Sequence, residues 1–380
     1  MITTINNKHN KLNFSNEREQ SQTCLNSAEH EKNQGRKVLN VPNLRFPEFQ
    51  GEWITYKIKD VLSIGNGRDY KHLSNGEIPV FGTGGYMTSV DECLYDGETT
   101  FIGRKGSINK PFYYNGKFWT VDTLFYTHSF NGITPKFTYC LFQTINWLKY
   151  NEASGVPSLS KDTIEKIKIK IPGLEEQNKI AKLMFALDER IATQSKIIDK
   201  LQSLIKGIRN KLFENDKDWR KAKIREFLCI GNGKDYKHLD IGDIPVYGTG
   251  GKMLSVNDFL YDGDSVCIGR KGTIDTPLFL TGKFWTVDTL FYTYGFKDVL
   301  PKFCYYLFKQ INWQLYNEGT GVPSLSKSTI ENIKVRIPSI VQQYKICYIL
   351  DSYEDKIKNE GLILDLYCSQ KQYLLRQMFV

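Results

Sequence analysis

The sequence of 380 residues contains one long unit written twice. Residues 64–85 and 230–251 agree at 17 of 22 positions, IGNGRDYKHLSNGEIPVFGTGG against IGNGKDYKHLDIGDIPVYGTGG, at an offset of 166 residues. The same offset, without a gap, relates two copies each of IGRKG, FWTVDTLFYT and GVPSLSK. An internal repeat of this kind predicts two copies of one fold with one function, at residues 53–213 and 219–379.

Composition limits the class of protein. A hydrophobic content of 41%, with 22 Phe and 22 Tyr, is enough to build buried cores. No apolar run is as long as a membrane span and the first residues lack a secretory signal, so we expect a cytoplasmic protein without membrane contact. Residues 1–37, rich in Asn, Gln, Ser, Glu and Lys, are expected to be a disordered tail.

Charge and cysteine content narrow the class further. Of the net charge of +9, +8 lies beyond residue 52, which favours a polyanionic partner, although many basic surfaces are only solvated. The eight cysteines share no position between the two copies and include no CxxC pair. We therefore expect reduced, buried, apolar cysteines and no metal site.

Each copy begins with a part whose pattern predicts an α+β domain dominated by strands. Residues 53–173 and 219–339 are dense in Gly, aromatic and β-branched residues in short runs such as IPVFG and TTFIG. YDG and YNGK, and the acidic pairs at 96–98 and 262–264, are interpreted as turns. Residues 137–150 and 303–316 predict a helix packed on the sheet, and 167–171 a closing strand that ends at Pro172.

Each copy ends with a helix of heptad periodicity. Apolar residues alternate steps of three and four, interrupted by Gln194 and, at the equivalent position, by Glu360. Only five residues separate 213 from 219, so the second helix must run back along the first. We therefore expect an antiparallel coiled coil about 50 Å long. That length equals roughly 15 base pairs of double-stranded DNA. The predicted seam is Ile180, Met184, Leu187, Ile191, Ile198, Leu201, Ile205, Ile208 and Leu212, with Ile346, Leu350, Tyr353, Ile357, Leu364, Tyr367, Lys371, Leu374 and Met378.

The order of these motifs resembles the specificity subunit of bacterial type I restriction-modification enzymes. PNLRFPEFQGEW at 42–53, GTGG followed by IGRKG, and a closing GVPSLSK carry the resemblance, which covers about residues 38–380. It implies a first target recognition domain at 38–173, a spacer helix and linker at 174–218, a second domain at 219–339 and a second spacer helix at 340–380. It also implies that each domain contacts one half of a bipartite sequence in double-stranded DNA.

The resemblance further implies a non-catalytic chain without a cofactor of its own. Its partners would be two adenine-N6 methyltransferase subunits that use S-adenosylmethionine, and restriction subunits that use ATP and Mg. A subunit serving a methyltransferase-only or other restriction assembly stays open, as does a tandem carbohydrate- or peptide-binding module. The chain contains no NPPY-like tetrapeptide, P-loop, Ser-His-Asp arrangement or nuclease cluster, and Asp122 and Asp288 are assigned no catalytic role.

Two recurring motifs supply candidate DNA contacts. In GRKG, Arg104 and Lys105 stand between glycines that would let the backbone approach a ligand while two cations reach phosphates; the alternative is a solvated turn. In GNGRDYKHL, Asn66, Arg68 and Asp69 could pair with adenine, guanine and cytosine, or the Asn-Gly could make a turn that the Asp caps. The remaining candidates are Lys71 and His72, the latter not a metal ligand, and the second-copy residues Asn232, Lys234, Asp235, Lys237, His238, Arg270 and Lys271.

The two remaining motifs leave their roles open. Ser160 and Lys161, with Ser326 and Lys327, could donate to phosphate or could cap the helices that follow. GTGG lacks the spacing of a nucleotide-binding loop, so we expect a tight, exposed loop. The recognition motifs of the two copies differ only by Arg68 against Lys234, which predicts a nearly palindromic, interrupted target.

Overall fold

The structure is a computed structural model that describes residues 40–214 and 218–380; the predicted tail at 1–37 lies outside the described residues. By its contacts the chain divides into two compact units. Unit 1 takes the described residues up to Ala186 together with Gln370–Val380, and unit 2 takes Leu187–Ser369. No helix in the described part is long and apolar enough to cross a membrane.

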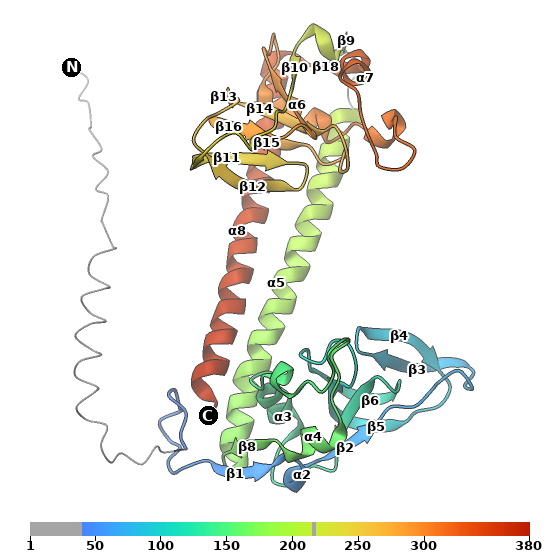
Figure 1. Ribbon diagram of the computed structural model, residues 1–380, viewed down its shortest axis with the longest axis vertical. Helices are drawn as coiled ribbons and strands as arrows, with labels where there is room; N and C mark the ends of the chain where they lie inside the picture. Colours follow the sequence, from blue (N-terminus) through green and yellow to red (C-terminus); the bar gives the residue numbers. More distant parts are fainter. Residues whose placement is uncertain (1–39, 215–217) are drawn as a thin grey trace, which may run out of the picture. The chain divides into compact units, whose positions relative to one another are not determined.

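Unit 1 is built on a six-stranded sheet with the order β2-β7-β5-β6-β3-β4. Neighbouring strands are antiparallel except β3 and β6, which pair in parallel. A separate antiparallel pair joins β1 to the predicted closing strand β8. The strands are β1 (Ile54–Lys57), β2 (Ser63–Asn66), β3 (Asn75–Gly82), β4 (Gly85–Val90), β5 (Tyr95–Gly103), β6 (Phe112–Thr120), β7 (Leu124–His128) and β8 (Lys168–Ile171) (Figure 1).

Unit 2 repeats these pairings, but the counterparts of β5 and β6 are each divided into two shorter strands. One four-stranded sheet has the order β10-β17-β14-β15, another β12-β11-β16-β13, and β18 pairs with β9. The strands are β9 (Arg220–Lys223), β10 (Cys229–Asn232), β11 (Ile241–Gly248), β12 (Gly251–Val256), β13 (Tyr261–Asp262), β14 (Ser265–Gly269), β15 (Leu278–Leu280), β16 (Lys283–Thr286), β17 (Leu290–Tyr294) and β18 (Lys334–Ile337).

The interpretation of YDG and YNGK as turns is wrong for the first copy. β5 and β6 run through both motifs, and Gly97 lies directly opposite Gly116 in the ladder. Both glycines have positive φ, 144° and 130°, a backbone region that only glycine adopts readily. The pair therefore bends a continuous hairpin. In unit 2 the strands do break there, between β13 and β14 and between β15 and β16.

The prediction of one helix over 137–150 is also wrong, because the observed helix ends at Phe142. α3 (Pro135–Phe142) stops and a separate 3₁₀ turn, η1 (Trp147–Tyr150), follows. The indole Nε1 of Trp147 donates to the carbonyl of Phe142 at 2.8 Å, which satisfies an acceptor that a longer helix would have used. The other short helices are α2 (Ile58–Val61) and α4 (Lys161–Lys166), with η2 (Ile224–Glu226), α6 (Pro301–Phe308), η3 (Trp313–Tyr316) and α7 (Lys327–Asn332) in unit 2.

Two long helices, α5 (Leu174–Glu214) and α8 (Ile340–Met378), carry the predicted heptads (Figure 1). Every predicted seam residue is buried or half-buried. In unit 2, Ile205 and Ile208 pack with Ile346 and Leu350, while Gln194 Nε2 donates to Glu360 Oε2 at 2.6 Å. In unit 1 the start of α5, at Ile180 and Met184, shares a core with Leu375 and Met378 of α8. The antiparallel coiled coil is thereby confirmed.

The cysteines agree only in part with the expectation of burial. Cys140, Cys267, Cys304 and Cys347 are buried, and burial raises the pKa of the Cys267 thiol to about 12. Cys93 and Cys229 are exposed, so the expectation is wrong for them, because neither position is part of a core. All seven described cysteines are free thiols, and Cys24 lies outside the described residues.

Candidate nucleic-acid interface

The turn between β6 and β7, residues 120–123 of FWTVDTLFYT, organises the candidate site; we call it the hub turn. The carbonyl of Thr120 accepts a hydrogen bond from the backbone N–H of Arg68 at 2.8 Å. The carbonyl of Thr123 accepts one from the backbone N–H of Arg104, also at 2.8 Å. The N–H of Val121 donates to Phe81 of β3 at 3.1 Å. The second hub turn, 286–289, makes the same bonds with Lys234, Arg270 and Tyr247, at 2.8, 2.7 and 3.0 Å. In each copy, motifs far apart in sequence therefore meet at one turn.

The glycines of these motifs allow close packing within the protein. A Cβ added to Gly67 would lie 1.9 Å from the Val121 carbonyl oxygen, and one at Gly65 2.2 Å from the ring of Tyr126. At Gly103 it would lie 2.4 Å from the Ser107 carbonyl oxygen, across the GRKG turn. Gly106 has a φ of 87°. Hence contacts inside the fold account for these glycines without a ligand.

GRKG is also tied to the loop that contains PSLSK. Gly106 N donates to the Pro157 carbonyl at 2.8 Å, and Leu159 N donates to the Arg104 carbonyl at 2.9 Å. The equivalent bonds in unit 2 run from Gly272 to Pro323 and from Leu325 to Arg270, both at 2.9 Å. The two motifs therefore form one continuous surface in each unit.

The two cations of GRKG are held differently. Arg104 is half-buried; its Nη1 donates to the Asp122 carbonyl at 3.3 Å and its guanidinium lies 5.9 Å from the centre of the Phe125 ring. Lys105 is exposed, and its side chain makes no hydrogen bond or ion pair within the described residues. Arg270 repeats the carbonyl contact with Asp288 at 3.4 Å. The arginine is thus oriented by the hub turn, whereas the lysine extends freely into solvent.

The GNGRDYKHL loop combines features of both interpretations. Asn66 lies at the end of β2, exposed and paired with Phe125, so the Asn-Gly step does not make a turn. Asp69 does cap locally, since its Oδ1 accepts from Lys71 N at 3.4 Å. His72 is exposed and its ring packs edge-on against Trp119 at 5.9 Å. In the second copy the same relations hold for Asn232, Asp235, Lys237 and His238.

Capping is confirmed for the serines of PSLSK. Ser160 Oγ accepts from Thr163 N at 3.2 Å at the start of α4, and it donates its own proton to Glu152 Oε1 at 2.7 Å. Ser326 does the same for Thr329 and Glu318. A phosphate role for these hydroxyls remains a prediction. Lys161 and Lys327 lie beside acidic residues one helical turn on, Glu165 at 3.6 Å and Glu331 at 3.7 Å.

Glu152 and Glu318 were missed by the sequence analysis. Hydrogen bonds from the hydroxyls of Thr163 and Ser160 lower the pKa of Glu152, and Thr329 and Ser326 lower that of Glu318. Each carboxylate thereby fixes the loop that faces GRKG. The recurrence of Asn-Glu at 151–152 and 317–318 was the signal that could have identified them.

Three motifs of unit 2 surround one cavity of about 490 Å³. Its charged lining consists of three cations and one carboxylate, so the hollow is basic. GTGG lies beside the second hub turn, 286–289. It forms a two-residue hairpin loop in which Gly248 pairs with Gly251, which confirms the expected tight loop. The cavity is lined by Asn232, Arg270, Lys271, Phe291, Glu318, Ser324, Leu325, Ser326 and Lys327. Lys234, Asp235, Lys237 and His238 are exposed but do not line it.

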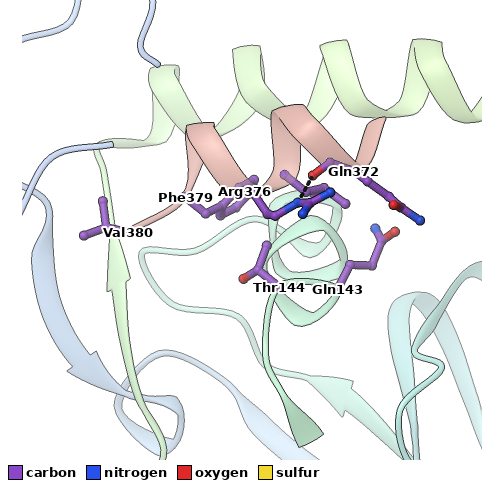
Figure 2. A pocket seen from close by; sticks show the side chains of 7 residues that line it. Gln143, Thr144, Gln372, Arg376, Phe379 and Val380 are labelled. Atoms are coloured by element: carbon purple, nitrogen blue, oxygen red, sulfur yellow. Dashed lines mark hydrogen bonds between the residues drawn. The ribbon is translucent and has the colours of Figure 1, made fainter. Parts of the chain in front are cut away.

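A second cavity, of about 520 Å³, lies in unit 1 where the end of α8 meets α3 (Figure 2). Gln143 and Thr144 face Gln372, Arg376 and Phe379 across it, and Arg376 Nε donates to the Gln372 carbonyl at 3.2 Å. None of the recurring motifs contributes to its lining, so it is separate from the candidate interface. Among residues 40–214 and 218–380, no group of three or more His, Cys, Asp or Glu could hold a metal ion.

Known proteins share this sequence pattern. A putative type I restriction enzyme specificity subunit from Haemophilus influenzae is 25% identical over 334 residues, covering 79% of this chain and 86% of the relative. The specificity subunit of a type I restriction enzyme from Methanocaldococcus jannaschii is 24% identical over 327 residues, covering 70% of this chain and 72% of the relative.

The fold and the family model agree. The S subunit of a type I restriction-modification system from M. genitalium has a TM-score of 0.66 at 18% identity, covering 90% of this chain and 99% of that one. A chain from a structure on complex assembly of the type I system has a TM-score of 0.56 at 13% identity, covering 86% and 97%. The model of the type I restriction modification DNA specificity domain matches residues 50–203 and again 216–365. This chain therefore belongs to the family of type I restriction-modification specificity subunits, with two specificity domains in tandem.

Proposed function

We propose that each specificity domain binds one half of a bipartite target in double-stranded DNA through the surface around its hub turn. The observation that carries this proposal is the gathering of GNG, GRKG and PSLSK around one basic cavity in unit 2, with equivalent backbone contacts in unit 1. Exposed lysines on such a surface suit phosphates, and the oriented Arg104 and Arg270 suit the O6 and N7 acceptors of guanine.

The target is nearly palindromic in this proposal. The hub turns are identical in sequence, and the bonds that hold the motifs to them differ by at most about 0.1 Å between the copies. The α5–α8 pairing is antiparallel, which suits half-sites in inverted orientation. Some exposed positions differ between the copies, such as Tyr86 and the equivalent Lys252 in the β-hairpins. At such positions the two domains could recognise different base pairs, and the target would then depart from a palindrome.

The chain acts without chemistry of its own in this proposal. It binds and orients two methyltransferase subunits, which carry S-adenosylmethionine, and restriction subunits, which carry ATP and Mg. Names of the relatives as specificity subunits support this division of labour. The long helices α5 and α8 offer the surface on which such partners would assemble.

Mapping of methylated adenines in a host that expresses this chain with its methyltransferase tests the proposal directly. We expect two short half-sites that are reverse complements or nearly so, separated by a spacer of fixed length. Unrelated half-sites would contradict the symmetry, and methylation independent of this chain would contradict the function. The purified chain alone should neither methylate nor cleave DNA, and methyl transfer by a preparation free of partners would overturn the non-catalytic assignment.

A further inference from the structure

The hub turn carries an acidic residue that belongs to none of the candidate DNA-contact motifs. Asp122 and its equivalent Asp288 occupy the same position of identical turns, and both are exposed. Each lends its backbone carbonyl to the neighbouring arginine, at 3.3 and 3.4 Å. Within the described residues, neither carboxylate has a hydrogen bond or an ion pair. One unpaired carboxylate therefore lies on the hub turn of each unit, next to the arginine of GRKG.

The negative charge of these carboxylates limits which groups of DNA they can bind. A carboxylate next to Arg104 and Lys105 repels the phosphates that those cations attract, so it weakens general DNA binding. An ionised carboxylate only accepts hydrogen bonds. On the major-groove edges of the bases, the donors are the amino groups N4 of cytosine and N6 of adenine. A base amino group is thus the one part of DNA that this carboxylate favours.

The position beside the arginine supports the same conclusion. The contact of Arg104 with the carbonyl of Asp122 places a strong donor and a strong acceptor at one residue of the hub turn. Arginine pairs with the O6 and N7 acceptors of guanine, and Asp pairs with cytosine N4. Asp69, for which the sequence left pairing with cytosine open, already accepts from the N–H of Lys71 at 3.4 Å. Asp122 is consequently the freer acceptor of the two.

We propose that Asp122 and Asp288 are specificity-determining residues, each of which accepts a hydrogen bond from an exocyclic base amino group in one half-site. The inference rests on the proposed function and names the chemistry that the hub turn recognises. Because the turns are identical, both residues select the same base, at symmetry-related positions of the two halves. Cytosine and adenine are the two bases that present such an amino group in the major groove.

The test uses the full chain assembled with its methyltransferase partner. Binding is measured against duplexes in which each base pair of the mapped target is replaced in turn, for wild type, Asp122→Asn, Asp122→Ala and the equivalents at Asp288. We expect each variant to lose roughly 10- to 100-fold of discrimination at one base pair of one half-site. Asparagine adds donors to the acceptor, so Asp→Asn should admit bases that present an acceptor. The base at the affected position distinguishes cytosine from adenine.

The matched controls are Glu92→Gln in unit 1 and Asp243→Asn in unit 2, exposed acids outside the motifs whose carboxylates make no hydrogen bond or ion pair in the described part of the chain. They remove the same charge, so they should raise affinity for all sequences slightly and leave discrimination intact. If the Asp122 and Asp288 variants behave like these controls, the inference is wrong and the aspartates only repel. If the wild-type assembly discriminates no base pair, the proposed function itself fails.

Discussion

The two copies of the repeat are alike around the hub turns and differ where each domain packs on the long helices. Around the hub turns the backbone contacts are the same: Arg68 to Thr120 and Lys234 to Thr286 are both 2.8 Å long. Where the domain packs on the long helices the chemistry differs. Lys136 of unit 1 lies over the ring of Phe185, whereas the equivalent Lys302 forms an ion pair with Asp351 at 3.1 Å. The two copies therefore share the backbone contacts around the hub turn and differ in the side-chain contacts to the long helices.

The segment before each domain shows a second difference. In unit 1, Arg45 forms a bidentate pair with Glu176, which is 3% exposed and also accepts from Trp53 Nε1 at 3.4 Å. In unit 2 the equivalent positions hold Lys211 and Gln342, both exposed. The first domain therefore contains a partly buried ion pair, with a buried carboxylate, that the second domain lacks.

The strongest test of the equivalence is to remove one copy. A fragment of residues 38–218 should form a homodimer, because its α5 can pair with a second α5 through the seam from Ile180 to Leu212. Analytical ultracentrifugation at micromolar concentration should give twice the monomer mass. A monomer would count against interchangeable helices. The polar Gln194, which would face itself, is the residue that could weaken the pairing.

Substitution of Arg45 should give the largest effect on stability. Arg45→Ala leaves the carboxylate of Glu176 buried without its partner, which costs about 3–5 kcal/mol in comparable buried pairs. Denaturant unfolding should detect this loss. The matched control is Lys211→Ala at the equivalent, exposed position of unit 2, which should change the free energy of unfolding by less than about 0.5 kcal/mol. Equal effects would show that the pair is not buried in solution.

Removal of the GRKG cations should weaken DNA binding equally in both copies. The double variant Arg104→Ala/Lys105→Ala loses the base contact of Arg104 and the phosphate contact of Lys105, so affinity should fall and the slope of log affinity against log salt should fall by about 1. Arg270→Ala/Lys271→Ala should match it. Fluorescence anisotropy at several salt concentrations measures both quantities. Unchanged slope and affinity in both variants would make GRKG a solvated turn.

The smallest predicted effect is a dependence on acid pH. The pKa of Glu152 and of Glu318 is lower in the folded protein than the ordinary value of 4.5. A lowered carboxyl pKa stabilises the fold above the unfolded value, and this contribution is lost as pH falls through the folded pKa. Glu152→Gln and Glu318→Gln should therefore reduce the loss of stability below about pH 4.5, to a similar small extent in each copy. Thermal unfolding between pH 3 and 7 checks this, and unaltered profiles would contradict it.

The secondary structure was predictable where local rules dominate. The heptads of α5 and α8, the closing strand β8 and the tight GTGG loop follow from periodicity and turn chemistry within a few residues. The errors arose where a contact between two particular residues overrides the local pattern. Gly97 reads locally as a turn, but it is opposite Gly116 in a ladder. The predicted helix at 137–150 ends because the side chain of Trp147 folds back to cap it.

The sequence by itself determined that there are two equivalent domains and which helices pair, because a duplication records these as identical spacing. Only the tertiary structure decided how the motifs meet. Phe118 and Phe125 of FWTVDTLFYT are buried, yet the turn between them is where GNG and GRKG are hydrogen-bonded together. Backbone carbonyls make those bonds, and because every residue has one, no choice of side chain reveals which carbonyls will be used.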